Sequence, residues 1–235
     1  MTPTNTFPAL HSDTPYQKKM TMHKITDATV LNTLDWLYQD ASSDKRRLLT
    51  VFPKLLSGTL QPSDARKAYL PINRDQGEFI YDLLITEGAK HIVEFGTSFG
   101  ISTLFLGAAA RQTGGRVVTS ELLPEKCAIA QKNFERAGIA DLVDLREGDA
   151  METLATVDDG IDFLLLDGWN NLYLPLLQMV EHKLSKGAYI YTDNASFPGT
   201  ESLLSYLREN PTKFDSEHMK TGKGGIELTK YLGGA

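Results

Sequence analysis

Cysteine and long apolar runs are nearly absent from this sequence of 235 residues. The single cysteine, Cys127, has no partner within the chain for a disulfide, and its place in a predicted helix favours a structural thiol over a nucleophile. No apolar run approaches the roughly 18 residues that a membrane-spanning helix needs. Residues 1–17 lack the basic and apolar regions of a secretory signal. We therefore expect a cytoplasmic protein that folds on a hydrophobic core alone.

Basic charge is also scarce, with 24 lysines and arginines against 30 aspartates and glutamates, for a net charge of −6. This excess of negative charge disfavours sequence-independent binding to nucleic-acid phosphates. The five histidines include no pair at zinc-ligand spacing, and no serine lies in a nucleophile elbow. These absences leave a small molecule as the expected partner, with neither nucleic acid nor membrane involved.

Short apolar runs alternate with amphipathic segments from residue 91 onward. The expected strands are 91–95, 116–120, 143–146, 161–166 and 188–192. The expected helices between and after them are 102–111, 124–137, 150–155 and 173–184. Aliphatic strands, each followed by a helix, indicate a parallel sheet covered on both faces. Residues 218–227 contain a glycine turn between two strands expected to be antiparallel. The pattern predicts an α/β fold: a doubly wound, Rossmann-like, mostly parallel seven-stranded sheet with an antiparallel C-terminal hairpin.

The segment before this alternation is predicted to be helical. Its expected helices are 25–38, 44–56 and 75–87. No glycine- or serine-rich linker separates this part from the rest of the chain. Residues 25–75 are therefore interpreted as a helical cap, preceded by a mobile N-terminal arm (1–24) and followed by the main domain (76–235). The cap could also carry a homodimer contact.

A glycine-rich turn follows the first predicted strand, where residues 94–100 read EFGTSFG. Gly96 lacks a Cβ, which permits a sharp turn and lets ligand atoms approach the backbone, and Gly100 opens the next helix. Ser98 stands where a pyrophosphate-binding fingerprint needs its second glycine. The turn therefore predicts a nucleoside cofactor that has no pyrophosphate.

Acidic residues follow the next two predicted strands. Glu121 lies at the end of the second strand, where a carboxylate can accept hydrogen bonds from both ribose hydroxyls. Asp149 comes after Gly148 at the end of the third strand, within reach of an adenine amino group. Three such features in order favour a nucleoside site over isolated surface acids.

Two carboxylates and an amide follow the fourth and fifth predicted strands, at Asp167, Asp193 and Asn194. Neighbouring strands lie about 4.8 Å apart, so these side chains are expected to converge. Two buried carboxylates repel unless they are paired, and Mg²⁺ prefers oxygen ligands of this kind. The alternative is that Asp167 caps the following helix while Asp193 and Asn194 only form a turn.

These features resemble the class I S-adenosylmethionine-dependent methyltransferases, over residues 69–232. The resemblance implies that the methionine part of the cofactor contacts the turn, at Glu94, Gly96, Ser98, Gly100 and Ser102. It implies that the ribose is held by Glu121. The adenine is implied to lie near Gly148, Asp149 and Ala150.

Residues 167–175 and 192–199 are more specifically similar to catechol O-methyltransferases. Residues 69–73 resemble the part of those enzymes that lies over the sulfonium, which adds Asn73 to the implied cofactor contacts. The resemblance also implies that Trp169 packs on the adenine beside Asp167.

The same resemblance implies a reaction that depends on a metal. Magnesium held by Asp167, Asp193 and Asn194 would bind two vicinal hydroxyls of the acceptor and lower the pKa of the attacking oxygen. Methyl transfer is then an in-line displacement at the sulfonium, which depends on holding the two reactants close together.

One position departs from the family. Where the family carries a lysine as general base, three residues after the first metal aspartate, this chain has Asn170. A neutral amide cannot take a proton at neutral pH, which leaves three alternatives: the metal alone acidifies the hydroxyl, another residue serves as the base, or the activity differs. His218 lies in a region where the family places a substrate-contacting residue. The candidate catalytic residues are therefore Asp167, Asn170 and His218.

Three hypotheses follow from the sequence. The leading one is a magnesium-dependent, S-adenosylmethionine-dependent O-methyltransferase that acts on a small catechol-like or other vicinal-oxygen acceptor. The second is a metal-independent methyltransferase that acts on another nucleophile. The third is a non-catalytic cofactor-binding module that assembles through its N-terminal helices. A nicotinamide oxidoreductase is disfavoured by the turn.

Overall fold

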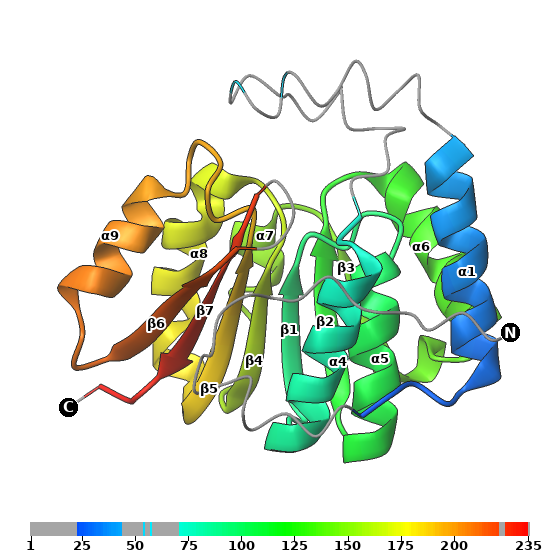
Figure 1. Cartoon of the computed structure of the whole chain (residues 1–235), viewed down its shortest axis with the longest axis horizontal. Coiled ribbons are helices and arrows are strands. Elements are labelled where there is room, and N and C mark those ends of the chain that lie inside the picture. Colours follow the sequence, from blue (N-terminus) through cyan, green and yellow to red (C-terminus); the bar gives the residue numbers. More distant parts are fainter. Residues whose placement is uncertain (1–22, 44–53, 55–56, 58–70, 221–223, 235) are drawn as a thin grey trace, which may run out of the picture.

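A computed structural model describes residues 23–43, 54, 57, 71–220 and 224–234 (Figure 1). Its strands are β1 (His91–Phe95), β2 (Arg116–Glu121), β3 (Val143–Glu147), β4 (Ile161–Leu166), β5 (Leu184–Asp193), β6 (Phe214–Met219) and β7 (Ile226–Tyr231). Its α-helices are α1 (Ala28–Ser43), α4 (Arg74–Glu87), α5 (Ile101–Thr113), α6 (Pro124–Ala137), α7 (Ala150–Thr153), α8 (Tyr173–Val180) and α9 (Glu201–Glu209). Short 3-10 turns are η2 (Ala140–Leu142), η3 (Asn170–Leu172) and η4 (Glu181–Lys183).

The seven strands form one sheet in the order β3-β2-β1-β4-β5-β7-β6. Strands β1 to β5 pair in parallel, and β7 is antiparallel to both β5 and β6. The chain runs outward from β1 to β3 and then returns to the other side of β1 with β4. In a doubly wound sheet, ligands bind at this reversal, beyond the carboxyl ends of the strands. The predicted sheet and its C-terminal hairpin are confirmed.

Helices cover both faces of the sheet (Figure 1). One face carries α1, α4, α5 and α6, whose apolar side chains join a single buried cluster that includes Leu34, Phe105 and Phe134. The other face carries α7, α8 and α9, and its cluster includes Leu177 and Leu203. This two-sided burial explains why the central strands read as continuous apolar runs rather than alternating ones.

The N-terminal helix α1 belongs to the main body of the fold. The Asp27 carboxylate accepts hydrogen bonds from the backbone N–H groups of Thr29 (2.9 Å) and Val30 (3.3 Å), which caps the helix start. The helix expected over 25–38 is thus confirmed, although it runs further, to Ser43. The predicted helix 44–56 and nearly all of the predicted arm 1–24 lie outside the described residues. Across the described ranges, no helix has the length and apolarity that crossing a bilayer requires.

The segment 173–193 differs from its prediction. The expected helix 173–184 ends as α8 at Val180 and continues as the 3-10 turn η4, and β5 begins at Leu184, earlier than the expected strand start at 188. A register irregularity in the β4–β5 pairing lies between Ile161 and Phe163. The strand therefore includes Leu184, the last residue of the expected helix, because pairing with Ile161 of β4 satisfies backbone groups there.

Candidate functional site

The glycine turn after β1 lies at the switch point between β1 and β4. Gly96 has φ +104°, and a Cβ added there would lie 2.4 Å from the carbonyl oxygen of Asp167. Gly100 has φ +87°, and its Cβ would overlap the ring of Phe134. Ser98 also adopts a positive φ of +50°, which is uncommon for a residue other than glycine. Glycine is therefore required at both positions, because neighbouring atoms leave no room for a Cβ and because the backbone has a positive φ.

Glu94 supports this turn from within the sheet. Its carboxylate is fully buried and accepts hydrogen bonds from the hydroxyls of Ser102 (2.5 Å), Thr103 (2.6 Å) and Thr119 (2.6 Å). Burial raises the pKa of Glu94, and the three hydroxyl donors oppose that shift. The hydroxyl of Ser102 thus points at Glu94, so these two residues brace the turn.

Glu121 closes the turn from the end of β2. One oxygen of its carboxylate accepts the backbone N–H of Ser98 at 2.8 Å, and the other accepts that of Leu123 at 3.0 Å. The side chain is nearly buried, with 9% of the residue exposed. The predicted ribose-binding acid is therefore fixed directly beside the predicted methionine-binding turn.

Lys126, which the sequence reasoning did not single out, reaches the same turn from the first turn of α6. Its ammonium lies 3.2 Å from the hydroxyl of Ser98 and 5.1 Å from the ring centre of Phe99. Burial lowers the pKa of Lys126, while the charges of Glu121 and Asp167 act to raise it. Lysine in a helix is so common that no sequence signal marks it. Only the fold brings it to the crevice.

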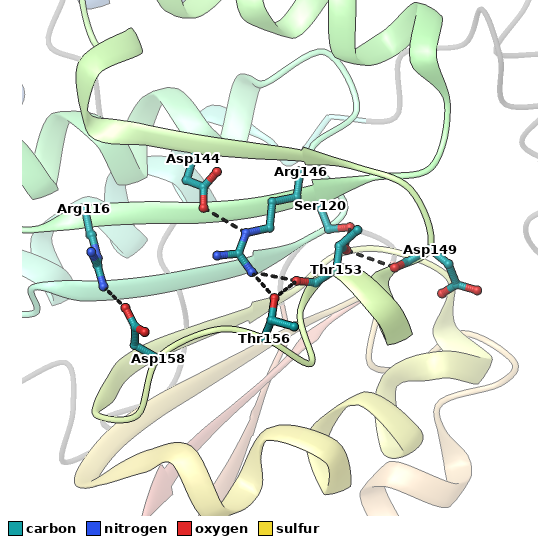
Figure 2. A network of polar contacts seen from close by, with 8 residues as sticks. All are labelled: Arg116, Ser120, Asp144, Arg146, Asp149, Thr153, Thr156 and Asp158. Atoms are coloured by element: carbon teal, nitrogen blue, oxygen red, sulfur yellow. Dashed lines mark hydrogen bonds and ion pairs between the residues drawn. The ribbon is translucent and has the colours of Figure 1, made fainter.

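The turn that follows β3 is held by a polar network (Figure 2). The Asp149 carboxylate accepts the backbone N–H of Met151 at 2.8 Å and so caps α7. The backbone carbonyl of Asp149 accepts the hydroxyl of Thr153 at 3.0 Å, and that hydroxyl also lies 2.7 Å from the Ser120 hydroxyl.

The same turn is joined to β2 through its glycine. The N–H of Gly148, at φ +134°, donates to the carbonyl of Glu121 at 2.9 Å. Ala150 is buried at the start of α7. The three predicted adenine-side residues, at positions 148–150, therefore lie next to the predicted ribose-side acid.

The carboxyl ends of β4 and β5 bring Asp167 and Asp193 together. Loss of hydration, the charges of Asp193 and Glu94, and a hydrogen bond with Asp193 hold the pKa of Asp167 well above its usual range. Burial raises the pKa of Asp193 too, against hydrogen bonds from its neighbours. The two carboxyls thus lie close enough for each to affect the pKa of the other.

Neighbouring amides support Asp193. Asn194, at φ +56°, donates its side-chain N–H₂ to Asp193 at 2.8 Å. Gln76, on α4, donates to the other oxygen of Asp193 at 2.7 Å. The side chain of Gln76 also accepts the backbone N–H of Asn73 at 2.9 Å. Gln76 was not predicted, since a contact 117 residues away in sequence leaves no local signal.

The donor set fits a hard cation. No cluster of three or more histidine, cysteine, aspartate or glutamate side chains suited to a metal occurs among the residues that the structure describes. The predicted set instead has two carboxylates and the amide oxygen of Asn194, which suits Mg²⁺ with waters completing the shell. The alternative role of Asp167 as a helix cap is not seen, because η3 has Trp169 at its N-cap and no side-chain hydrogen bond there. The turn expected at Asp193 and Asn194 under the same alternative does form, since the N–H of Phe197 donates to the carbonyl of Asn194 at 2.8 Å.

The side chain of Asn170, in the loop after β4, is held by a hydrogen bond to the loop after β5. Its side-chain N–H₂ donates to the carbonyl of Pro198 at 3.1 Å, which ties this loop to the one after β5. Gly168 lies against Phe95, whose ring a Cβ at this position would overlap at 2.5 Å. Trp169 is half-buried and packs on the α8 side of the core.

The remaining predicted residues lie at the two sides of this crevice. Asn73 is the N-cap of α4 and accepts the backbone N–H of Gln76 at 2.8 Å, so its side chain is engaged by the helix. Residues 69–70 lie outside the described part of the chain. His218, on β6, has its ring nitrogens near Glu227 (3.1 Å) and Ser196 (3.4 Å).

The chain is similar in sequence to known methyltransferases. Residues 39–205 match the model of a family described as O-methyltransferase. A catechol O-methyltransferase of Mycobacterium tuberculosis is 35% identical over 143 residues, which are 59% of this chain and 64% of that protein. A catechol O-methyltransferase of Niastella koreensis is 32% identical over 163 residues, 68% of this chain and 71% of that protein. The chain thus spans less than two thirds of the mycobacterial relative.

Solved structures share the fold. The O-methyltransferase of Bacillus cereus in complex with SAH superposes with a TM-score of 0.67 at 22% identity, covering 92% of this chain and 95% of that one. TomG of Streptomyces achromogenes, in complex with SAM, gives a TM-score of 0.69 at 20% identity, covering 93% and 95%. The sequence-based recognition is confirmed by the family match, which spans most of the chain. The chain belongs to the O-methyltransferase family.

Proposed function

We propose that the protein is an S-adenosylmethionine-dependent O-methyltransferase that holds magnesium and methylates one of two vicinal hydroxyls on a small molecule such as a catechol. Membership of the O-methyltransferase family supports the reaction class. The observation that carries the metal and the acceptor class is the Asp167–Asp193 pair, together with Asn194, at the switch point. The similarity to two catechol O-methyltransferases supports the same acceptor class.

The proposed donor site begins at the glycine turn and crosses the ends of β1 to β4. Its proposed contacts are Asn73, Glu94, Gly96, Ser98, Gly100, Ser102, Glu121, Gly148, Asp149, Ala150, Asp167 and Trp169. The missing Cβ atoms at Gly96 and Gly100 and the nearly buried Glu121 carboxylate support a ligand with ribose hydroxyls held close to the backbone.

The proposed metal site explains two acids that would otherwise repel. Asp193 is only 8% exposed, and two carboxylates at close range in little water cannot both stay ionised without a counter-charge. A divalent cation supplies that charge. Because Asn194 donates its N–H₂ to Asp193, its amide oxygen is left to act as a ligand. When bound, the cation would hold the two acceptor oxygens and lower the pKa of the attacking one.

Substitution of the acid pair tests this proposal. Asp167→Asn and Asp193→Asn should each lose magnesium binding in calorimetry and lower kcat/KM on catechol by about 100-fold or more, since a metal ligand that also holds the acceptor is removed. Product SAH should still bind to Asp193→Asn. Asp158→Asn is the matched control, because that exposed carboxylate pairs with Arg116 on the surface.

A second candidate function is favoured by one observation. The side-chain amide of Asn170 is committed to Pro198 and cannot accept a proton, which fits a methyltransferase that acts without metal on a more reactive nucleophile. Wild-type turnover in both acid variants, on any acceptor, would support this candidate and contradict the magnesium-dependent one.

A further inference from the structure

A histidine, a buried glutamate and a serine lie in line beside the proposed metal site. His218 on β6 and Glu227 on β7 are cross-strand partners, and the His218 Nδ1 atom lies 3.1 Å from Glu227 Oε2. The side chain of Glu227 is only 3% exposed, whereas that of His218 is 34% exposed. A carboxylate at Glu227 can only accept from the ring, so this contact favours a hydrogen on Nδ1 and makes Nε2 the atom that can take up a proton.

The other ring nitrogen, Nε2, lies next to the loop that follows β5 and carries the proposed metal ligand Asn194. His218 Nε2 lies 3.4 Å from the hydroxyl of Ser196, two positions after Asn194. Backbone hydrogen bonds fasten this loop to the hairpin, from Ser196 N–H to the Gly224 carbonyl at 2.8 Å and from Ala195 N–H to the Gly225 carbonyl at 3.2 Å.

Glycine is needed for this approach. A Cβ at Gly225, which has φ +59°, would lie 2.9 Å from His218 Nε2 and 3.0 Å from the Ser196 hydroxyl. A side chain at that position would therefore fill the space between the ring and the loop. The backbone of Gly225 thus lies close to His218 Nε2 and to the loop that follows β5.

We propose that His218 is the general base of the reaction and that Glu227 is its positioning residue. This inference rests on the proposed function, because it needs a hydroxyl acceptor at Asp193 and Asn194. The acceptor oxygen forms a bond to the methyl carbon of the donor, and the carbon–sulfur bond breaks with its electron pair left on sulfur. The acceptor's proton passes to His218 Nε2, and the imidazolium then loses it to water.

Other groups near the crevice are less suited to this role. Asn170 has no basic atom, and Lys126 is directed at Ser98 on the donor side. Next to His218 along the hairpin, Glu217 precedes it on β6, Lys220 follows the end of that strand, and Glu227 lies across from it on β7. Of these, Glu227 is the one that contacts the ring.

Acceptors of different acidity test the base directly. His218→Gln should slow methylation of catechol by roughly 100-fold or more, in line with general-base catalysis. The same variant should slow methylation of 4-nitrocatechol by only about threefold, because that acceptor is already largely ionised at neutral pH and needs no base. His182→Gln, at an exposed histidine of η4, is the matched control and should leave both rates unchanged. Equal losses on the two acceptors would show a merely structural role and overturn the proposal.

The ring's hydrogen-bonding state gives a readout that needs no turnover. In ¹⁵N spectra of the wild type at neutral pH, His218 should show a protonated Nδ1 and a free Nε2, and Glu227→Gln should lose this preference. Glu227→Gln should also lower kcat on catechol while KM changes little. A wild-type ring protonated on Nε2 would overturn the proposal. A wild type with the expected ring state but no methylation of any catechol would instead contradict the proposed acceptor class, and the base proposal with it.

Discussion

Lys126 carries a buried positive charge into a crevice where Glu121 and Asp167 supply negative ones. Its ammonium is fixed by the Ser98 hydroxyl and the face of Phe99. A charge in this position acts on any ligand that is itself charged. The donor S-adenosylmethionine has a positive sulfonium, whereas the product left after methyl transfer has a neutral sulfur. If the donor binds at the proposed site, Lys126 is therefore expected to distinguish donor from product through their difference in charge.

Removal of this charge should change the ratio of two affinities. Lys126→Met should tighten donor binding relative to product binding by about three- to tenfold, because a repulsion on the order of 1 kcal/mol at the sulfonium is lost. Calorimetry without acceptor or metal measures both dissociation constants. Since the ribose and adenine are the same in both ligands, their contribution cancels in the ratio.

Lys126→Arg provides the charge-preserving control and should keep the wild-type ratio. A ratio that stays the same in Lys126→Met would contradict the argument, even if both affinities fall together.

Single residues of the site differ in how far the sequence predicts them. Glu121 and Asp193 follow strands whose ends converge by topology, so their position follows from the strand pattern. Gln76 reaches Asp193 only because α4 packs across the end of β5. Its helical pattern gives no hint of that contact, and Lys126 was missed for the same reason.

At the scale of elements, α4 and α5 pack closely through a glycine. A Cβ at Gly77 would lie 2.3 Å from the Phe105 ring, inside any permitted contact. Both residues are buried. This contact holds α4 against α5, and α4 carries Gln76, which donates to Asp193 in the proposed metal site.

Gly77→Ala should therefore destabilise the protein by about 1–3 kcal/mol through overpacking, although alanine favours a helix over glycine by about 1 kcal/mol. Urea unfolding measures the change in the free energy of unfolding. Phe105→Leu in the same chain should recover part of the loss, since it frees space next to position 77. A stability gain in Gly77→Ala would refute the packing argument.

The element boundaries show where local pattern is insufficient. The expected helix 173–184 leaves the α-helical conformation after Val180, passes through the 3-10 turn η4 and enters β5 at Leu184, which pairs with Ile161 of β4. Sequence periodicity favours continuation of the helix, and only the tertiary pairing decides against it. Conversely, the starts of α6 and α7 were predicted well. Pro124 marks the first turn of α6, and Asp149 caps α7 through the N–H of Met151.

At the scale of the whole molecule, the sheet topology places the proposed donor and metal sites together, beyond the carboxyl ends of the parallel strands. The donor-side residues come from the ends of β1, β2 and β3, and the metal-side residues come from β4 and β5. The antiparallel β7, which carries Glu227, lies next to β5, and it pairs in turn with β6, which carries His218. Right-handed crossovers and a single reversal of direction make this arrangement predictable from the order of strands and helices. The partner of each buried acid is not predictable in this way.

The central claim is that methyl transfer to a vicinal hydroxyl requires magnesium. The most direct measurement is transfer of a labelled methyl group from S-adenosylmethionine to catechol by the metal-stripped protein, before and after addition of Mg²⁺. The account predicts that a chelator abolishes product formation and that Mg²⁺ restores it, with resorcinol, whose hydroxyls are not adjacent, methylated poorly under both conditions. Full activity of the stripped protein on catechol would contradict it.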